Sequence, residues 1–133
     1  MATKKAVKKT TAADQTITDP KTGLEWSLTL GKRVDWKTAK KVAESCRAGG
    51  HDDWRFPTIE ELITLSDFSR VSPAANTDLF HDMESSWYWS STPLASSPGG
   101  FAWSVSFLNG VVNYDNQHYS AFVRAVRGSR AGQ

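Results

Sequence analysis

The segment from Phe101 to Gly110 constrains the fold more than any other part of the sequence. Large apolar residues alternate there with a second row: Phe101, Trp103, Val105 and Phe107 against Ala102, Ser104, Ser106 and Leu108. A period of two residues is that of a β-strand with one face on the core. Asn109-Gly110 follows, which is typical of a tight antiparallel hairpin. The sequence therefore predicts a hairpin with an inner core row and an outer row on the surface.

Two helices are predicted upstream of this hairpin. Asp35 is a candidate N-cap for a helix whose apolar residues recur at helical spacing until Gly49-Gly50 ends the pattern. Thr58 and Glu61 have the spacing of a capping box, in which two side chains satisfy backbone N–H groups reciprocally. A second helix is therefore expected directly after Thr58.

Short strands are predicted on either side of the helices. Residues 16–18 and 23–30 have strand-like composition, as do residues 87–89 and the final segment 122–127. The order of strands, two helices and then an antiparallel β meander predicts an α+β domain over residues 15–130.

Charge is distributed unevenly along the chain. The net charge is +2, but residues 1–10 carry four lysines and no acid, so residues 11–133 sum to +2 − 4 = −2. We expect residues 1–14 to be a disordered basic tail with no more than weak contact to nucleic acid. The chain has no apolar stretch long enough to span a membrane and no secretory signal, which favours a cytoplasmic or virion-associated protein.

Residues 85–123 contain one charged side chain, Asp115, among Ser, Asn, Gly and aromatic residues. This composition is typical of surfaces that bind proteins or glycans, because rigid aromatics supply contact area and small polar residues supply adaptable hydrogen bonds. We expect one binding face with Tyr114 and Tyr119 as anchors; the alternatives are a plain solvent face and a solvated loop. Its predicted members are Ser104, Ser106, Leu108, Asn113, Tyr114, Asp115, His118, Tyr119, Ser120 and Ala121. The predicted rim is Tyr88, Leu94, Ala95, Ser96, Ser97 and Phe101.

Metal and catalytic sites have little support in the sequence. The only candidate metal ligands, Asp52, Asp53, Asp78, His81, Asp82 and Glu84, match no calcium-loop spacing. No hydrolase or metalloprotease motif is present, and Cys46 falls on the apolar face of a helix. We therefore expect a protein that is not an enzyme and that holds no cofactor or metal.

Several large side chains are assigned to the scaffold. The expected core or core-edge tryptophans are Trp26, Trp36, Trp54, Trp87 and Trp89. Arg124 and Arg127 face opposite sides of the last strand because they stand three residues apart. One of them is expected to be buried against a carboxylate such as Asp53 or Glu61.

Six segments occur in a characteristic order. They are TGLEW (22–26), the helix that starts at Asp35-Trp36, HDDWRFPTIEELITL (51–65), YWSST (88–92), AWSVSFLNG (102–110) and FVRAVR (122–127). In this order they resemble the C-terminal domain of the Legionella collagen-like adhesin family. The resemblance implies a C-type-lectin-like fold, of the formylglycine-generating-enzyme type, and an adhesin-like binding role. The enzymes of that fold need a cysteine pair, and this chain has one cysteine, so their activity is not expected here.

The C-terminal part also resembles the variable proteins of diversity-generating retroelements. Those systems mutate adenines, largely in AAC codons, and the resulting codons cannot encode Lys, Glu, Gln, Met or Trp. All ten predicted face residues belong to the reachable set, whereas Gln117 does not and is assigned to the scaffold. The leading hypothesis is a retroelement variable protein that binds a protein or glycan, with a homo-oligomer giving avidity. The alternatives are an adhesin-type glycan-binding domain without diversification and a particle-assembly module.

Overall fold

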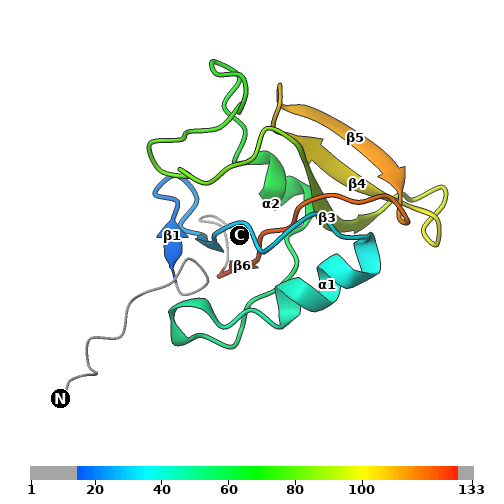
Figure 1. Cartoon of the computed structure of the whole chain (residues 1–133), viewed down its shortest axis with the longest axis horizontal. Coiled ribbons are helices and arrows are strands. Elements are labelled where there is room, and N and C mark those ends of the chain that lie inside the picture. Colours follow the sequence, from blue (N-terminus) through cyan, green and yellow to red (C-terminus); the bar gives the residue numbers. More distant parts are fainter. Residues whose placement is uncertain (1–14, 129–133) are drawn as a thin grey trace.

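The computed structural model describes residues 15–128, so the predicted basic tail at residues 1–14 lies outside the described residues. Two helices and two antiparallel three-stranded sheets form an α+β domain, which confirms the predicted class. Figure 1 shows their arrangement. The elements are β1 (Thr16–Thr18), β2 (Glu25–Ser27), α1 (Trp36–Glu44), the 3-10 turn η2 (Ala48–Gly50), α2 (Ile59–Ile63), β3 (Trp87–Pro93), β4 (Phe101–Ser106), β5 (Val111–Asn116) and β6 (Val126–Arg127).

The first sheet joins the two ends of the described chain. Its strand order is β1-β2-β6, and Trp26 of β2 pairs with Ile17 on one side and with Val126 on the other. Apolar residues dominate its inward positions, and Trp26 is fully buried. The predicted strand at 23–30 is therefore present but is limited to β2.

The second sheet is the predicted antiparallel meander, with strand order β3-β4-β5. Ser106 pairs with Val111, so four residues form the hairpin loop rather than Asn109-Gly110 alone. Phe107 leaves the ladder because its ring is buried against Tyr88, with 5.3 Å between the ring centroids. Gly110 has φ +86°, a conformation that strains any other residue, and a Cβ there would lie 2.7 Å from the exposed Phe68 ring and displace it.

Both helices begin at the predicted caps. Asp35 accepts a hydrogen bond from the Thr38 N–H, and Thr58 and Glu61 form the complete capping box. Both terminal nitrogens of Arg55 donate hydrogen bonds to the Glu61 carboxylate, at 2.7 and 2.6 Å. Burial raises the pKa of Glu61, but the bonds from Arg55 and Thr58 outweigh it and hold the pKa below its usual value. This ion pair fixes the short α2 helix, whose five residues alone would not be stable.

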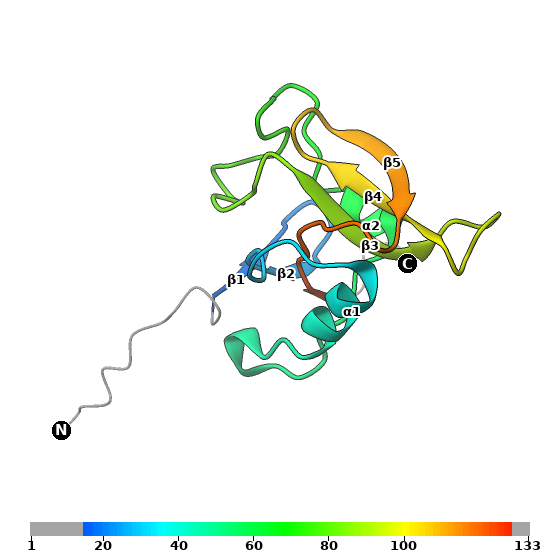
Figure 2. The same cartoon turned by 45° about the vertical axis from the view of Figure 1, so that its right-hand side comes forward.

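The β3-β4-β5 sheet is covered on both faces near its β3 side (Figure 2). One face carries Tyr88 and Val105, which pack with Leu62 of α2. The other face carries Trp89 and Ala102, which pack with α1 and with the segment 121–125. The expected tryptophans belong to these clusters or their edges, as predicted: Trp26, Trp36, Trp54, Trp87 and Trp89.

Arg124 is the buried arginine, but its partner is Asp82 and not Asp53 or Glu61. Its Nη2 donates to Asp82 Oδ1 at 2.9 Å, and its Nε donates to the Ser27 carbonyl at 3.1 Å. The guanidinium also lies 5.3 Å from the centroid of the Phe80 ring. Asp53 pairs instead with Arg127, which is on the rim of the first sheet. The sequence could not indicate Asp82 because the loop that carries it has no regular period.

Replacement of Arg124 by Met should lower the free energy of unfolding by about 3–5 kcal/mol, because Asp82 and the Ser27 carbonyl lose a buried cation. The matched variant Arg127→Met should cost clearly less, because Arg127 keeps contact with water and its partner Asp53 is 58% exposed. Chemical denaturation of both variants measures the difference. Equal losses would contradict the central role of Arg124.

Candidate functional site

Four of the sixteen predicted site and rim residues are buried. The prediction that they lie on a surface is wrong for Ser104, Ser106, Ala121 and Tyr88. The strand alternates as expected, but β4 lies in the middle of a sheet that has cover on both faces. The serine hydroxyls bond within the sheet; Ser106 Oγ, for example, accepts from the Leu108 N–H at 3.3 Å. A serine row therefore did not distinguish an exposed face from a tightly packed one.

The other predicted face residues follow β5 and its two ends. Six are exposed and Asp115 is half-buried. Leu108 stands in the hairpin loop, Asn113 to Asp115 lie in β5, and the exposed residues His118, Tyr119 and Ser120 follow the strand. Of the predicted rim, Ala95 and Ser96 are exposed and Leu94, Ser97 and Phe101 are half-buried.

Tyr114 does not share a face with Asn113 and Asp115, so the prediction of a single face is wrong. Tyr114 is paired with Trp103 across the β4–β5 ladder, whereas Asn113 is paired with Ser104. Successive side chains of a strand point to opposite faces. The predicted site is thus divided into an aromatic side and a polar side of the same edge strand.

Tyr114 is held by two neighbouring rings on the aromatic side. Its ring lies 5.4 Å from Trp103 and 6.1 Å from Phe101 between centroids, both in edge-on geometry. Tyr114 is 46% exposed, and the other two rings are half-buried. We call Phe101, Tyr114 and Trp103 the aromatic row. Edge-on pairs of this kind fix ring orientation, so the row is a pre-organised apolar platform. The sequence placed Trp103 in the core and so missed this role.

The polar side centres on Asp115. Ser104 Oγ lies 3.4 Å from Asp115 Oδ2, and none of the ion pairs in the described residues includes this carboxylate. Burial raises the pKa of Asp115, and the hydrogen bond from Ser104 offsets this only in part. The polar side therefore offers one carboxylate beside the exposed Asn113 amide.

Gln117 fixes the end of β5 to the neighbouring loop. Its Nε2 donates to the carbonyls of Pro98 and Phe101, at 3.1 and 3.0 Å. Its backbone N–H donates to the Gly100 carbonyl at 2.9 Å. The buried Gln117 is a scaffold residue, in keeping with its sequence assignment.

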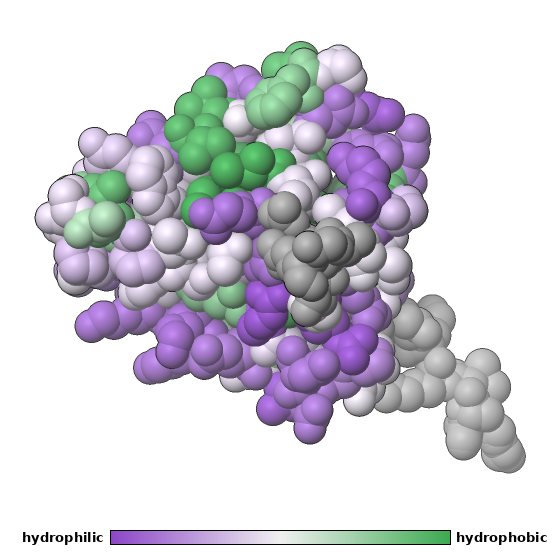
Figure 3. Space-filling model, turned by 180° about the vertical axis from the view of Figure 1, so that it is seen from behind, coloured by the Kyte–Doolittle hydropathy of each residue, from purple (hydrophilic) through white to green (hydrophobic). Residues whose placement is uncertain are grey.

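An exposed apolar cluster lies at the hairpin loop and was not predicted. Phe68 packs on Gly110, and the Ser72 N–H donates to the Leu108 carbonyl, so the loop that follows α2 lies against the hairpin. Figure 3 shows apolar side chains gathered on one part of the surface. The exposed members of this cluster are Phe68, Val71, Leu108 and Val111. Leu108 and Val111 lie in the charge-poor segment 85–123, but only Leu108 was among the predicted site residues. The loop that carries Phe68 has no sequence period from which its position could be predicted.

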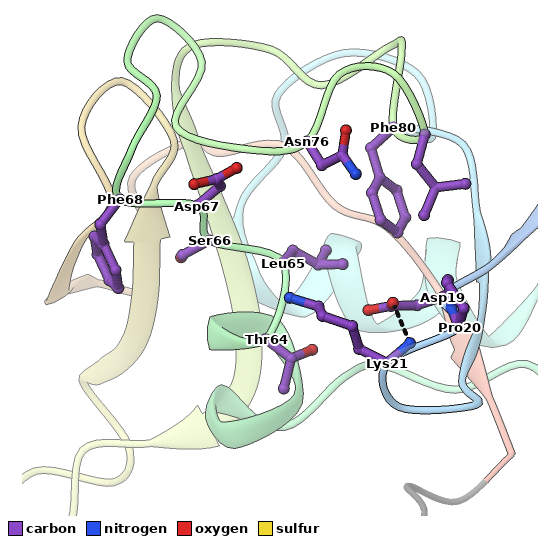
Figure 4. A pocket seen from close by; sticks show the side chains of 11 residues that line it. Asp19, Pro20, Lys21, Thr64, Leu65, Ser66, Asp67, Phe68, Asn76 and Phe80 are labelled. Atoms are coloured by element: carbon purple, nitrogen blue, oxygen red, sulfur yellow. Dashed lines mark hydrogen bonds between the residues drawn. The ribbon is translucent and has the colours of Figure 1, made fainter.

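A pocket of about 390 Å³ lies between the β1–β2 turn and the segment 64–80 (Figure 4). None of the predicted site residues lines it. Its carboxylates are engaged locally: Asp19 accepts from the Lys21 N–H, and Asp67 bonds Ser69 and Arg70. This pocket is therefore separate from the β5 surface.

The candidate metal ligands are dispersed. Asp78 pairs with Arg70, Asp82 with Arg124 and Asp53 with Arg127. Within residues 15–128, His, Cys, Asp and Glu side chains form no group of three or more with the spacing of a metal site. No helix of that range is both long enough and apolar enough to cross a membrane.

Replacement of Asp115 by Asn should raise the thermal unfolding midpoint at about pH 7 and have little effect at about pH 3. The folded-state pKa is raised, so the charged form destabilises the fold, and the penalty disappears as the pH falls and the carboxyl is protonated. Asp53→Asn is the control of opposite sign. The hydrogen bond from Arg127 holds the pKa of Asp53 below its usual value, so this variant should lose stability at about pH 7. A midpoint lowered at neutral pH by Asp115→Asn would contradict the account.

No curated protein matches the chain. The family model described as the Lcl C-terminal domain matches residues 15–127, which is nearly all of the described structure. The chain therefore belongs to the Lcl C-terminal domain family.

Proposed function

We propose that this domain binds a protein or glycan ligand through β5, the aromatic row and the turn at 118–120. Membership of the Lcl C-terminal domain family supports an adhesin-like, ligand-binding role. The observation that carries the proposal is Tyr114, an exposed ring held edge-on by Trp103 and Phe101. Rigid aromatic side chains at a surface lose little entropy when a ligand covers them.

The chemistry of this surface favours binding over catalysis. Asp115 is its one carboxylate and contacts the buried Ser104 hydroxyl at 3.4 Å, and no ion pair or hydrogen bond within residues 15–128 joins it to His118, the histidine of this surface. General acid–base or nucleophilic catalysis needs a second group placed to activate or accept a proton. The proposed role therefore rests on shape, aromatic contact and hydrogen bonds.

A more specific proposal is that a retroelement diversifies this surface, at seven of the ten positions expected from the sequence. Ser104, Ser106 and Ala121 are buried, so a change at these positions would alter packing before it altered a ligand contact. Seven positions remain at the surface: Leu108, Asn113, Tyr114, Asp115, His118, Tyr119 and Ser120. The gene tests this directly. AAC-derived codons at the seven positions, with a template repeat and a reverse transcriptase gene nearby, would support it, and their absence would remove it.

A neutral ligand fits the surface better than a sulfated glycan. Sulfate groups are bound by Arg and Lys side chains, and β5 and residues 117–123 carry neither. Heparin binding by the full chain should therefore depend on the lysines at positions 4, 5, 8 and 9. Substitution of these four lysines by Ala provides the background for ligand screening.

In that background, Tyr114→Ala should weaken binding of hits from a glycan array or a peptide-display library by about 1–2 kcal/mol, because a pre-organised anchor is lost. Tyr114→Phe should keep most of the affinity, because it retains the edge-on packing on Trp103. Tyr119→Ala tests the second predicted anchor in the same way. Calorimetry measures each loss. Hits that bind all three variants as tightly as the parent would refute the proposed surface.

A further inference from the structure

We propose that β5 pairs edge to edge with β5 of a second copy of this chain, antiparallel, about a two-fold axis at Tyr114. This assembly goes beyond the proposed function and does not depend on it. It would join the two sheets into one continuous six-stranded sheet.

The outer edge of β5 pairs with no other strand of the described residues, and Asp115 is the one charged side chain on this strand. β5 is the last strand of its sheet, and in Figures 1 and 2 no described segment runs along its outer side. Natural proteins block such edges with Lys, Pro or a bulge. The β4–β5 register is unbroken, and the sequence VVNYDN contains neither Lys nor Pro. Val111, Val112 and Tyr114 are all exposed.

The backbone groups that point outward can be identified from the hydrogen bond that follows the strand. The Gln117 N–H donates to the Gly100 carbonyl, so residue 117 faces β4 with its backbone groups. Backbone direction alternates along an antiparallel strand. Residues 111, 113 and 115 therefore face inward, and residues 112, 114 and 116 face outward. The Tyr114 N–H accordingly finds a side-chain partner, Asn113 Oδ1, at 2.8 Å.

These outward groups select one register for the pair. A two-fold axis normal to the sheet places residues of the same face opposite each other. Tyr114 opposite Tyr114 of the second copy then sets Val112 opposite Asn116 at both ends. All three outward-facing residues of each strand are used, whereas a shift by two residues would leave groups unpaired. The Asn116 carbonyl already accepts from the Tyr119 N–H at 2.9 Å, so it takes the bond across the edge with its second lone pair.

The side chains are compatible with this register. Asn113 would stand opposite Asp115 of the second copy, an amide beside a carboxylate, and the two Asp115 side chains would not face each other. The Asn113 amide must release the Tyr114 N–H for the strands to pair, and it is then free to donate to that carboxylate. The two Tyr114 rings, each already held by Trp103, become neighbours in one joint aromatic surface.

A second copy is the favoured occupant because the edge is complementary to itself in backbone groups and in charge. A strand rich in Lys or Glu would place charges against exposed Val111 and Val112. The interface consists of one six-residue strand from each copy, which is small, so we expect a reversible dimer with a dissociation constant in the micromolar range or weaker, above about 1 μM.

Sedimentation velocity of the full chain over a concentration series tests the proposal. Tyr114→Lys puts two like charges opposite each other at the axis and should weaken the dimer by about tenfold or more. Tyr119→Lys is the matched control, since Tyr119 is exposed but lies beyond the strand, and it should dimerise like the parent. Val112→Pro removes an outward N–H without affecting the β4 ladder, and it should also weaken the dimer.

Cysteine cross-linking tests the register. Tyr114→Cys should form a disulfide dimer under mild oxidation, because residue 114 lies opposite itself at about 5.5 Å between Cα atoms. Val112→Cys should not, because the two copies of residue 112 are offset by four residues, or about 13 Å. Circular dichroism and thermal unfolding confirm that each variant is folded.

Three outcomes would overturn the proposal. The first is a parent protein that stays monomeric at all concentrations, even if its β5 edge binds strand-forming peptides of other sequences. The second is a dimer that Tyr119→Lys disrupts as strongly as Tyr114→Lys does. The third is cross-linking at residue 112 that equals or exceeds cross-linking at residue 114.

Discussion

The buried guanidinium of Arg124 is the interaction on which the arrangement of the two sheets depends. A fully buried charged side chain needs hydrogen-bond partners on several sides. Arg124 donates to the Ser27 carbonyl of β2 and to Asp82 in the loop before β3. The segment that carries Arg124 also bonds Leu30 and Trp89 through its backbone. The last residues of the domain are thereby fixed between the first sheet and β3, which leaves β5 as the open side of the second sheet.

The sequence predicted the features that depend on local chemistry. The Asp35 cap, the capping box at Thr58 and the hairpin after β4 are each decided by residues within a few positions of one another. Features decided by distant neighbours were not predictable. Whether the serine row of β4 is exposed depends on α1 and the C-terminal segment, and the partner of Arg124 depends on an irregular loop. The C-type-lectin-like fold stays a prediction from the family resemblance.

For the candidate site, the sequence predicted which types of side chain are exposed but not which face of the strand carries them. The low charge of residues 85–123 indicated exposed polar and aromatic side chains. Asn113 and Tyr114 of β5 and Tyr119 and Ser120 after it are exposed, whereas Ser104 and Ser106 are buried. Composition cannot assign a face, because neighbouring residues of a strand point in opposite directions. Tyr114 therefore lies on the opposite face from Asn113, and Trp103 belongs to the aromatic row through its contact with Tyr114. The two faces of β5 thus differ in chemistry: one contributes Tyr114 to the aromatic row that continues on β4, and the other carries the polar side chains of Asn113 and Asp115.

The Gln117 amide bears on how much the β3–β4 loop can change in length. It fastens the carbonyls of Pro98 and Phe101 to the end of β5, and the Leu94 N–H donates to the Phe101 carbonyl at 2.9 Å, so the base of the β3–β4 loop is fixed on both sides of its tip. Ala95 and Ser96 at that tip are exposed. Surface tips secured at their base accept inserted residues at little cost. This tip is thus where a longer or shorter loop can be grafted to reshape the neighbourhood of the aromatic row while the sheet beneath is kept.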